Sequence, residues 1–244
     1  MKKVKILYIN GFLECMSPPI EFKPNNTDLV LALIATFGMP LFIGLLYDLT
    51  GALIPMLIYY VLFCVIIVKW RKKSLEYHIP KNWALKYFLI FIGVQIVTQI
   101  FAAILIKVSH DPLLGILLTV LIWAPINAFM EQLIWIYVFD SIAFRFPQDD
   151  PKKKYIGIIL GTILTFTLVG VIHVVYWPKF LMEIEIIRPW FQFFMAFQFL
   201  STTGYIVMYK KTKSMLPSAI LHLIIDVWAV LVAQYSILPY LIMF

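Results

Sequence analysis

Seven long apolar runs, separated by charged breaks or breaks containing Pro and Gly, constrain the fold of this chain more than any other feature. The runs cover residues 28–48, 51–69, 84–107, 112–144, 155–177, 188–209 and 216–243. About 20 apolar residues in a helix cross a bilayer, and lipid offers no water to satisfy backbone groups, so each run predicts a transmembrane helix. We therefore expect an all-α fold, a polytopic membrane helical bundle of about seven to eight transmembrane helices, in which residues 1–244 form a single membrane-embedded domain.

The composition excludes the soluble classes of protein. Hydrophobic residues make up 62% of the chain and charged residues only 14%, whereas about a quarter of the residues in a soluble domain are charged. A water-soluble globule, a disordered tail and a coiled coil are all excluded. The net charge of +7 is more often a signature of membrane topology than of nucleic-acid binding. We expect membrane lipid, and no nucleic acid, as a partner.

Lysine and arginine are distributed unevenly between the two sides of the predicted bundle. Seventeen of them lie in the N-terminal segment and in the connections at 69–86, 145–154 and 210–213, against three in the other connections. The positive-inside rule then places the N-terminus in the cytoplasm, with residues 1–27 as a cytoplasmic or interfacial segment. The Ile- and Lys-rich composition, without an organelle address, favours a multi-pass protein of a prokaryotic plasma membrane.

A few ionisable side chains lie inside the apolar runs, where each costs several kcal/mol unless it is paired or hydrated. They are Glu131, His173, His222 and Asp226. His222 and Asp226 are four residues apart and share a helical face, where the carboxylate can fix the imidazole tautomer. Asn127 and Glu131 repeat this spacing. One Glu, two His and one Asp on three runs favour a buried catalytic or metal-binding constellation.

Structural roles compete with this interpretation. A lone membrane histidine such as His173 is as often a packing residue. A hydrogen-bonded connection between helices is the less favoured interpretation of the His222–Asp226 pair. Asp140, near the end of its run, is interpreted as a solvated interface residue. Glutamines in the run at 84–107 favour interhelical hydrogen bonds over chemistry.

Two hydrolytic routes use these groups. In one, Glu131, His173, His222 and Asp226 are candidate ligands of Zn²⁺ with a position left open for water. In the other, Glu131 itself takes a proton from water while the histidines stabilise the oxyanion. The sequence contains neither the H-E-x-x-H motif of zinc proteases nor a G-x-S-x-G serine elbow.

Three short segments, residues 130–136, 169–173 and 222–226, carry a family resemblance. In their order and spacing they resemble the CAAX protease and bacteriocin-processing family of intramembrane endopeptidases, which includes the Ras-converting CAAX prenyl endopeptidases. The motifs of that family are Glu-Glu-x-x-x-Arg, Phe-x-x-x-His, and His-x-x-x-Asn or Asp. The resemblance covers roughly residues 115–235, which we expect to be the catalytic core.

The resemblance implies a glutamate-dependent or metal-dependent intramembrane protease. Glu131 would activate water, His173 and His222 would orient it or stabilise the oxyanion, and Asp226 would take the place of the last Asn or Asp of the motif. The substrate implied is a peptide or protein, which in the eukaryotic members is prenylated at a C-terminal Cys. The resemblance leaves the metal requirement open. We also expect a water-filled cavity that faces the cytoplasm and reaches near mid-membrane.

The sequence departs from the family motifs at Gln132, Ile136 and Val169, which replace the second Glu, the Arg and the Phe. Losing the Arg removes a cation that orients the carboxylate, and Gln132 removes one negative charge, so the two changes partly cancel. The pattern fits an active divergent enzyme, in which Asn127 and Gln132 are supporting residues. It equally fits a non-enzymatic relative that acts as a bacteriocin-immunity or membrane scaffold protein. A proton-coupled transporter would more often show inverted repeats, which are not seen.

Overall fold

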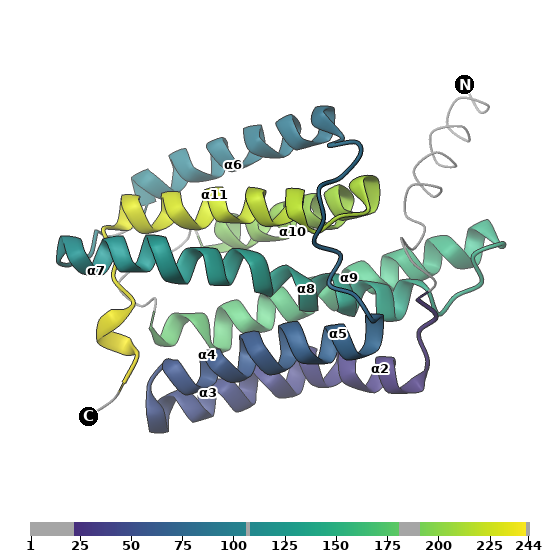
Figure 1. The fold of residues 1–244 in the computed structure, drawn as a ribbon, viewed down its shortest axis with the longest axis horizontal. Helices are drawn as coiled ribbons and strands as arrows, with labels where there is room; N and C mark the ends of the chain where they lie inside the picture. Colours follow the sequence, from purple (N-terminus) through teal and green to yellow (C-terminus); the bar gives the residue numbers. More distant parts are fainter. Residues whose placement is uncertain (1–21, 106–107, 181–190, 243–244) are drawn as a thin grey trace.

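The computed structural model describes residues 22–105, 108–180 and 191–242. This part of the chain is helical, without a β-strand among the described residues. Successive helices run up and down past one another and form a bundle (Figure 1). The predicted all-α bundle is confirmed. Most of the predicted N-terminal segment, residues 1–21, lies outside the described residues.

Seven helical rods occupy the seven predicted runs, counted over the described ranges. They are α2 (Asn26–Leu33), η1 (Ile34–Gly38) and α3 (Met39–Thr50); α4 (Leu53–Leu57), η2 (Ile58–Ile67) and α5 (Val68–Lys72); α6 (Leu85–Leu105); α7 (Leu113–Leu118), η3 (Thr119–Trp123) and α8 (Ala124–Ala143); α9 (Pro151–Val175) and η4 (Trp177–Lys179); α10 (Phe191–Thr212); and α11 (Leu216–Ala233), followed by η5 (Leu238–Tyr240). The segments η1, η2 and η3 are π-helical turns within their rods. Five of the rods, all except α6 and α10, are long and apolar enough to cross a membrane, which supports an integral membrane protein.

The last helix is shorter than its apolar run. It ends at Ala233, because Gln234 adopts a left-handed conformation (φ 48°) and its backbone N–H closes the helix on Leu231 and Val230. The chain then turns back towards α7 and η3, where the Ile237 N–H donates to the hydroxyl oxygen of Thr119 at 3.0 Å. The predicted helix at 216–243 is therefore wrong at its C-terminal end, since tertiary hydrogen bonds replace the helical ones after residue 233.

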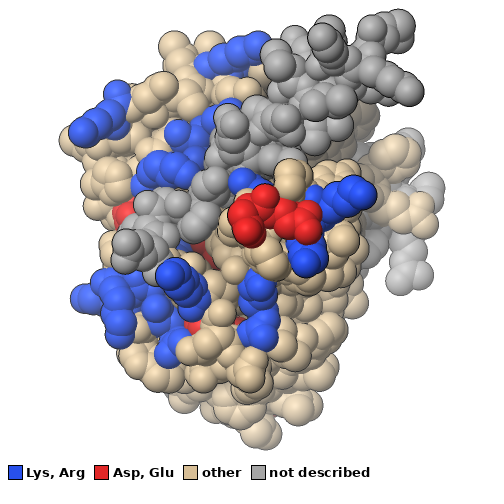
Figure 2. All heavy atoms as spheres, turned by 90° about the vertical axis from the view of Figure 1, so that its right-hand side faces the viewer, with Lys and Arg blue, Asp and Glu red and all other residues tan. Residues whose placement is uncertain are grey.

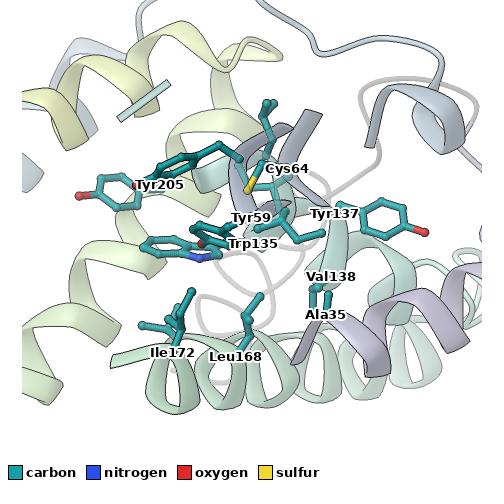
Figure 3. Close-up of a cluster of buried hydrophobic side chains, with 14 of the residues drawn as sticks. Ala35, Tyr59, Cys64, Trp135, Tyr137, Val138, Leu168, Ile172 and Tyr205 are labelled. Carbon is teal, nitrogen blue, oxygen red and sulfur yellow. The ribbon is translucent and has the colours of Figure 1, made fainter. Parts of the chain in front are cut away.

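Helix α8 is the central element of the bundle. Fifteen of its twenty residues are buried, and it packs against α9, α11 and η2. Two glycines of α9 allow the closest approach: a Cβ atom on Gly157 would lie 2.5 Å from the carbonyl oxygen of Ala143, and one on Gly161 would lie 2.8 Å from that of Phe139. Small residues permit such backbone contact between membrane helices. Figure 3 shows the resulting core, in which Tyr59 and Trp135 lie between the surrounding helices.

Asp140 is fully buried, so its interpretation as a solvated interface residue is wrong. Its Oδ2 accepts a hydrogen bond from Lys72 Nζ at 2.9 Å, and its Oδ1 accepts one from Lys210 Nζ. Lys72 also donates to the hydroxyl of Tyr209 at 3.0 Å. The position near the end of an apolar run misled the prediction, because α5 and α10 cover this turn of α8 from both sides. The shared carboxylate connects α5, α8 and α10.

A second ion pair connects α2 and α5 to α8. The Asp28 carboxylate, which is buried, accepts hydrogen bonds from Arg71 Nε at 2.9 Å and from Arg71 Nη2 at 3.0 Å. The hydroxyl of Tyr137 donates to the same carboxylate at 2.8 Å. Both ion pairs lie at the end of the bundle where α5, α8 and α10 end, which we call the basic end. Figure 2 views the molecule from this end, where Lys and Arg side chains gather around a few acidic ones.

Candidate functional site

Helix α8 carries Glu131 on its buried face, where the side chain is almost fully enclosed. The hydroxyl of Tyr59, from η2, donates a hydrogen bond to Glu131 Oε1 at 2.7 Å. The other carboxylate oxygen, Oε2, lies 3.7 Å from Nε2 of His222 on α11. The two oxygens of this carboxylate therefore have different neighbours, a hydrogen-bond donor on one side and an imidazole on the other.

His222 and Asp226 lie on one face of α11, as their spacing predicts. His222 Nε2 is 3.5 Å from Asp226 Oδ1, and Asp226 Oδ2 accepts a hydrogen bond from Asn127 Nδ2 at 2.9 Å. The hydroxyl of Tyr60 in turn donates to Asn127 Oδ1 at 2.7 Å. A chain of polar contacts thus runs from Tyr60 through Asn127, Asp226 and His222 to Glu131.

The contacts of His222 with the two carboxylates are longer than direct hydrogen bonds. Amine or imidazole N–H donors lie about 2.7–3.2 Å from an oxygen acceptor, and catalytic hydrogen bonds are often long until substrate binds. Two aromatic side chains pack against the imidazole instead. The centroid of the His222 ring lies 5.1 Å from that of the Tyr205 ring and 5.5 Å from that of the Trp135 ring. Its Nδ1 has no hydrogen-bond partner in the described part of the chain.

Helix α6 holds α11 through two glutamines. Gln95 Nε2 donates to the backbone carbonyl of Leu221 at 2.8 Å, and Gln99 Nε2 to that of Ile225 at 3.4 Å. These carbonyls belong to the residues immediately before His222 and Asp226. The predicted interhelical role of the glutamines is confirmed, and it places the backbone of α11 next to the site.

His173, on α9, forms a hydrogen bond with its own helix. Its Nδ1 lies 2.7 Å from the carbonyl oxygen of Val169, one helical turn earlier. A carbonyl only accepts hydrogen bonds, so Nδ1 carries the proton, and Nε2 of the neutral ring is left as an acceptor. The ring makes an edge contact with Phe194 of α10. No carboxylate of the described residues forms an ion pair with His173 within 4.0 Å.

The structure therefore brings together three of the four predicted residues, Glu131, His222 and Asp226, together with the supporting Asn127. Among the described residues His173 forms no hydrogen bond or ion pair with them, although its imidazole lies near enough to that of His222 for the two rings to interact electrostatically. Helix α9 extends beyond its neighbours at the basic end (Figure 1). Its predicted catalytic role stays a prediction.

The motif departures are buried. Gln132 has no exposed surface, and neither of its amide atoms has a hydrogen-bond partner among the described residues. Ile136 and Val169 lie in the hydrophobic core. No lysine or arginine of the described residues forms an ion pair with Glu131 within 4.0 Å; the phenol of Tyr59 donates to this carboxylate, and Trp177 and Asn127 are further polar neighbours.

Sequence reasoning missed Tyr59 and Tyr60. Both lie in the second apolar run, where a tyrosine is unremarkable as a membrane residue, and their partners on α8 are 72 and 67 residues away along the chain. The only sign of their role in the sequence was a tyrosine hydroxyl in the middle of an apolar run. Nothing in the sequence pairs that hydroxyl with a carboxylate on another helix.

The metal requirement stays a prediction. Among the described residues, no group of three or more His, Cys, Asp and Glu side chains has the arrangement to hold a metal ion. Near the basic end, a shallow hollow is lined by residues that include Lys72, Glu76, Leu133 and Tyr209. The hollow is too narrow for a water molecule, and the predicted water-filled cavity stays a prediction.

Comparison with known protein families gives a match. The family described as type II CAAX prenyl endopeptidase Rce1-like matches residues 112–228, a stretch that contains Glu131, His173, His222 and Asp226. No curated protein and no solved structure shows significant similarity to the chain. The resemblance that the three motifs predict is confirmed.

Proposed function

Because residues 112–228 belong to the Rce1-like family of type II CAAX prenyl endopeptidases, we propose that the chain is an intramembrane endopeptidase in which Glu131 activates water. The observation that carries this proposal is the meeting of the Glu131 carboxylate with the His222 imidazole, 3.7 Å apart and enclosed by the bundle. Buried ionisable groups in a membrane bundle are expensive and mark functional sites. The family match makes proteolysis the function that best fits them.

In the proposed mechanism, Glu131 is the general base. Its Oε2, the oxygen that does not accept from Tyr59, takes a proton from water as the water oxygen adds to the carbonyl carbon of the peptide bond. An N–H of the His222 imidazole stabilises the negative charge that develops on the carbonyl oxygen. Glu131 then returns the proton to the leaving amine as the carbon–nitrogen bond breaks. Asp226, held by Asn127, orients the imidazole.

The substrate in this proposal is a peptide or protein that reaches the site from the membrane or from the basic end. In this proposal the basic end faces the cytoplasm, following the positive-inside rule, and substrate binding opens a water-filled path from it towards Glu131. A substrate prenylated at a C-terminal Cys would place its lipid among the helices. The proposed location is a prokaryotic plasma membrane, with the N-terminus in the cytoplasm.

A non-enzymatic family member, acting as a bacteriocin-immunity or scaffold protein, is the alternative. It is favoured by Gln132 and Ile136, which replace the charged residues of the first motif with a neutral amide and a core aliphatic side chain. In that case the polar contacts around Glu131 only join α8, η2 and α11.

The test is peptide cleavage by the purified protein in detergent or liposomes, with prenylated and unprenylated peptides followed by mass spectrometry. Glu131→Gln keeps an oxygen for Tyr59 to donate to but removes the base, so we expect cleavage to fall by about 10²-fold or more. The control is Asp48→Asn, which breaks an exposed ion pair with Lys179 at the other end of the bundle and leaves cleavage unchanged. Equal cleavage by the wild type and Glu131→Gln would remove the enzymatic role of this carboxylate.

A chelator arm separates the two hydrolytic routes. Cleavage that is lost with chelator and restored by Zn²⁺ would support a metal-assisted reaction whose ligands come together only with the ion. Cleavage that is unaffected supports the route through Glu131 and His222 alone. No step above passes through a metal, because the described side chains do not form a metal-binding group.

A further inference from the structure

We propose that Tyr59 performs the task of the arginine missing from the first motif: it is a positioning residue that holds the Glu131 carboxylate, while its neighbour Tyr60 holds Asp226 through Asn127. This inference rests on the proposed function and adds residues to its site. The tyrosines belong to η2, outside the region 112–228 matched by the family. Neither is part of the three motifs.

The first argument is the geometry at Glu131. The Tyr59 hydroxyl donates to Oε1 at 2.7 Å, and both side chains are shielded from solvent. A hydrogen bond to an ionised acceptor is about twice as strong as one between neutral groups. This hydrogen bond also orients the carboxylate of Glu131. One of its oxygens accepts from the phenol, and the other faces His222.

The second argument is charge. The motif Glu-Glu-x-x-x-Arg carries two negative charges and one positive, whereas residues 131, 132 and 136 carry only the negative charge of Glu131. The net charge is the same in both cases. A cation beside Glu131 is therefore not needed to keep this balance. A neutral donor such as a phenol can support the carboxylate without burying another charge.

The third argument is the local backbone. Tyr59 and Tyr60 are consecutive, and their ring centroids lie only 5.1 Å apart. In an α-helix, consecutive side chains diverge by about 100°, but Ile58–Ile67 is π-helical, which turns less per residue. The two hydroxyls therefore reach Glu131 and Asn127, which lie one turn apart on the same face of α8. Short π-helical segments are frequent at functional sites.

The fourth argument is the packing of the Tyr59 ring. It makes edge contacts with the rings of Tyr176 and Trp177, with centroids 6.5 Å and 6.1 Å away. These contacts hold the phenol in one orientation, and the hydroxyl is aimed before substrate binds. Positioning residues whose own rotamers are locked by packing give the tightest site geometry.

The competing explanation is that these hydroxyls only join helices. The test uses Tyr59→Phe, which keeps the ring and its packing and removes the donor. We expect kcat to fall about 10- to 100-fold, the loss of one hydrogen bond to a charged group, with KM little changed. The dependence of the rate on pH should also change, because Glu131 loses a hydrogen-bond donor.

The matched control is Tyr137→Phe. Its buried hydroxyl also donates to a carboxylate, that of Asp28 at the basic end, so removing it should leave kcat and the pH profile unchanged. Tyr60→Phe should lower kcat less than Tyr59→Phe, since it acts on Asp226 through Asn127. An unchanged kcat in Tyr60→Phe would remove that half of the inference.

The outcomes separate this inference from the proposed function. If the wild type cleaves and Glu131→Gln does not, but Tyr59→Phe retains the wild-type kcat and pH profile, the positioning role is wrong and the protease remains. If Tyr59→Phe loses thermal stability and keeps kcat, the hydroxyl only joins helices. If the wild type and Glu131→Gln are equally inactive on every peptide, the proposed function fails first.

Discussion

Replacing Asp140 by asparagine removes the charge that the buried ammonium groups of Lys72 and Lys210 share. The exposed fractions of the three side chains are 1%, 6% and 0%, so water cannot replace the lost partner. Removing one member of a buried ion pair costs about 3–5 kcal/mol, because an uncompensated charge stays inside. Here two ammonium groups are left behind.

Aromatic rings offset part of this cost. Lys210 Nζ lies 4.4 Å from the ring centroid of Phe144, and Lys72 Nζ lies 4.8 Å from that of Tyr209. Each such cation–π contact contributes about 0.5–2 kcal/mol and survives the substitution. We therefore expect Asp140→Asn to lower the free energy of unfolding by about 3 kcal/mol, the lower part of the range for buried pairs.

The assay is reversible unfolding of the purified protein in mixed micelles by titration with a denaturing detergent, followed by tryptophan fluorescence. The matched control is Asp48→Asn, which breaks the ion pair with Lys179 whose side chains are 53% and 28% exposed. Exposed pairs contribute about 0–1 kcal/mol. Adding Lys210→Met to Asp140→Asn removes one orphaned charge and should recover at least about 1 kcal/mol.

The reasoning fails if Asp140→Asn and Asp48→Asn lower the free energy of unfolding equally. It also fails if the second substitution, Lys210→Met, destabilises the protein further, because the ammonium would then be a favourable group without its carboxylate. Either result would mean that the buried cluster is hydrated in the micelle and that its burial does not determine its energy.

Three further predictions concern packing, the second ion pair and pH. Gly161→Leu should lower the melting temperature and weaken crosslinking between α8 and α9. The Cβ atom of the new side chain would already meet the Phe139 carbonyl, and overpacking costs about 1–3 kcal/mol. An unchanged melting temperature would refute the close contact. Arg71→Ala should destabilise more than Asp28→Asn, because it leaves the buried Asp28 carboxylate without its cation, whereas the asparagine oxygen still accepts from Tyr137; unfolding titrations give the order, and the reverse order would count against it. Hydrogen bonds from backbone N–H groups hold the pKa of Asp150 below its ordinary value. Its capping of α9 is therefore complete above about pH 3.9 and is lost as the pH falls through the lowered pKa. Amide hydrogen exchange in the first turn of α9 should speed up at that pH, but not in Asp150→Asn, which caps the helix without titrating.

The spans and one half of the site could be predicted from the sequence. Apolar runs determine where helices form in lipid, since each segment must satisfy its own backbone groups, and every described rod begins within a few residues of its predicted run. The His222–Asp226 contact follows from helical spacing alone. The family motifs placed Glu131 in the same region as these residues.

The contacts between helices could not be predicted in the same way. Tyr59 and Glu131 are 72 residues apart, and their meeting depends on how η2 is rotated and how deep it lies against α8. The place of His173 beside Glu131 stays a prediction: its ring contacts its own helix and Phe194 of α10, and side-chain direction on α9 is set by packing rather than by spacing.

Local sequence therefore determined which segments are helical, which side chains share a face and where the charges gather. Only the tertiary structure decided that Asp140 is enclosed between α5 and α10, that α11 stops at Ala233, and that a tyrosine rather than an arginine supports Glu131. The physical reason is the range of the interactions. Backbone hydrogen bonding and transfer into lipid act within one segment, whereas the rotation and depth of each helix are set by contacts, such as those at Gly157 and Gly161, between segments that are distant in the chain.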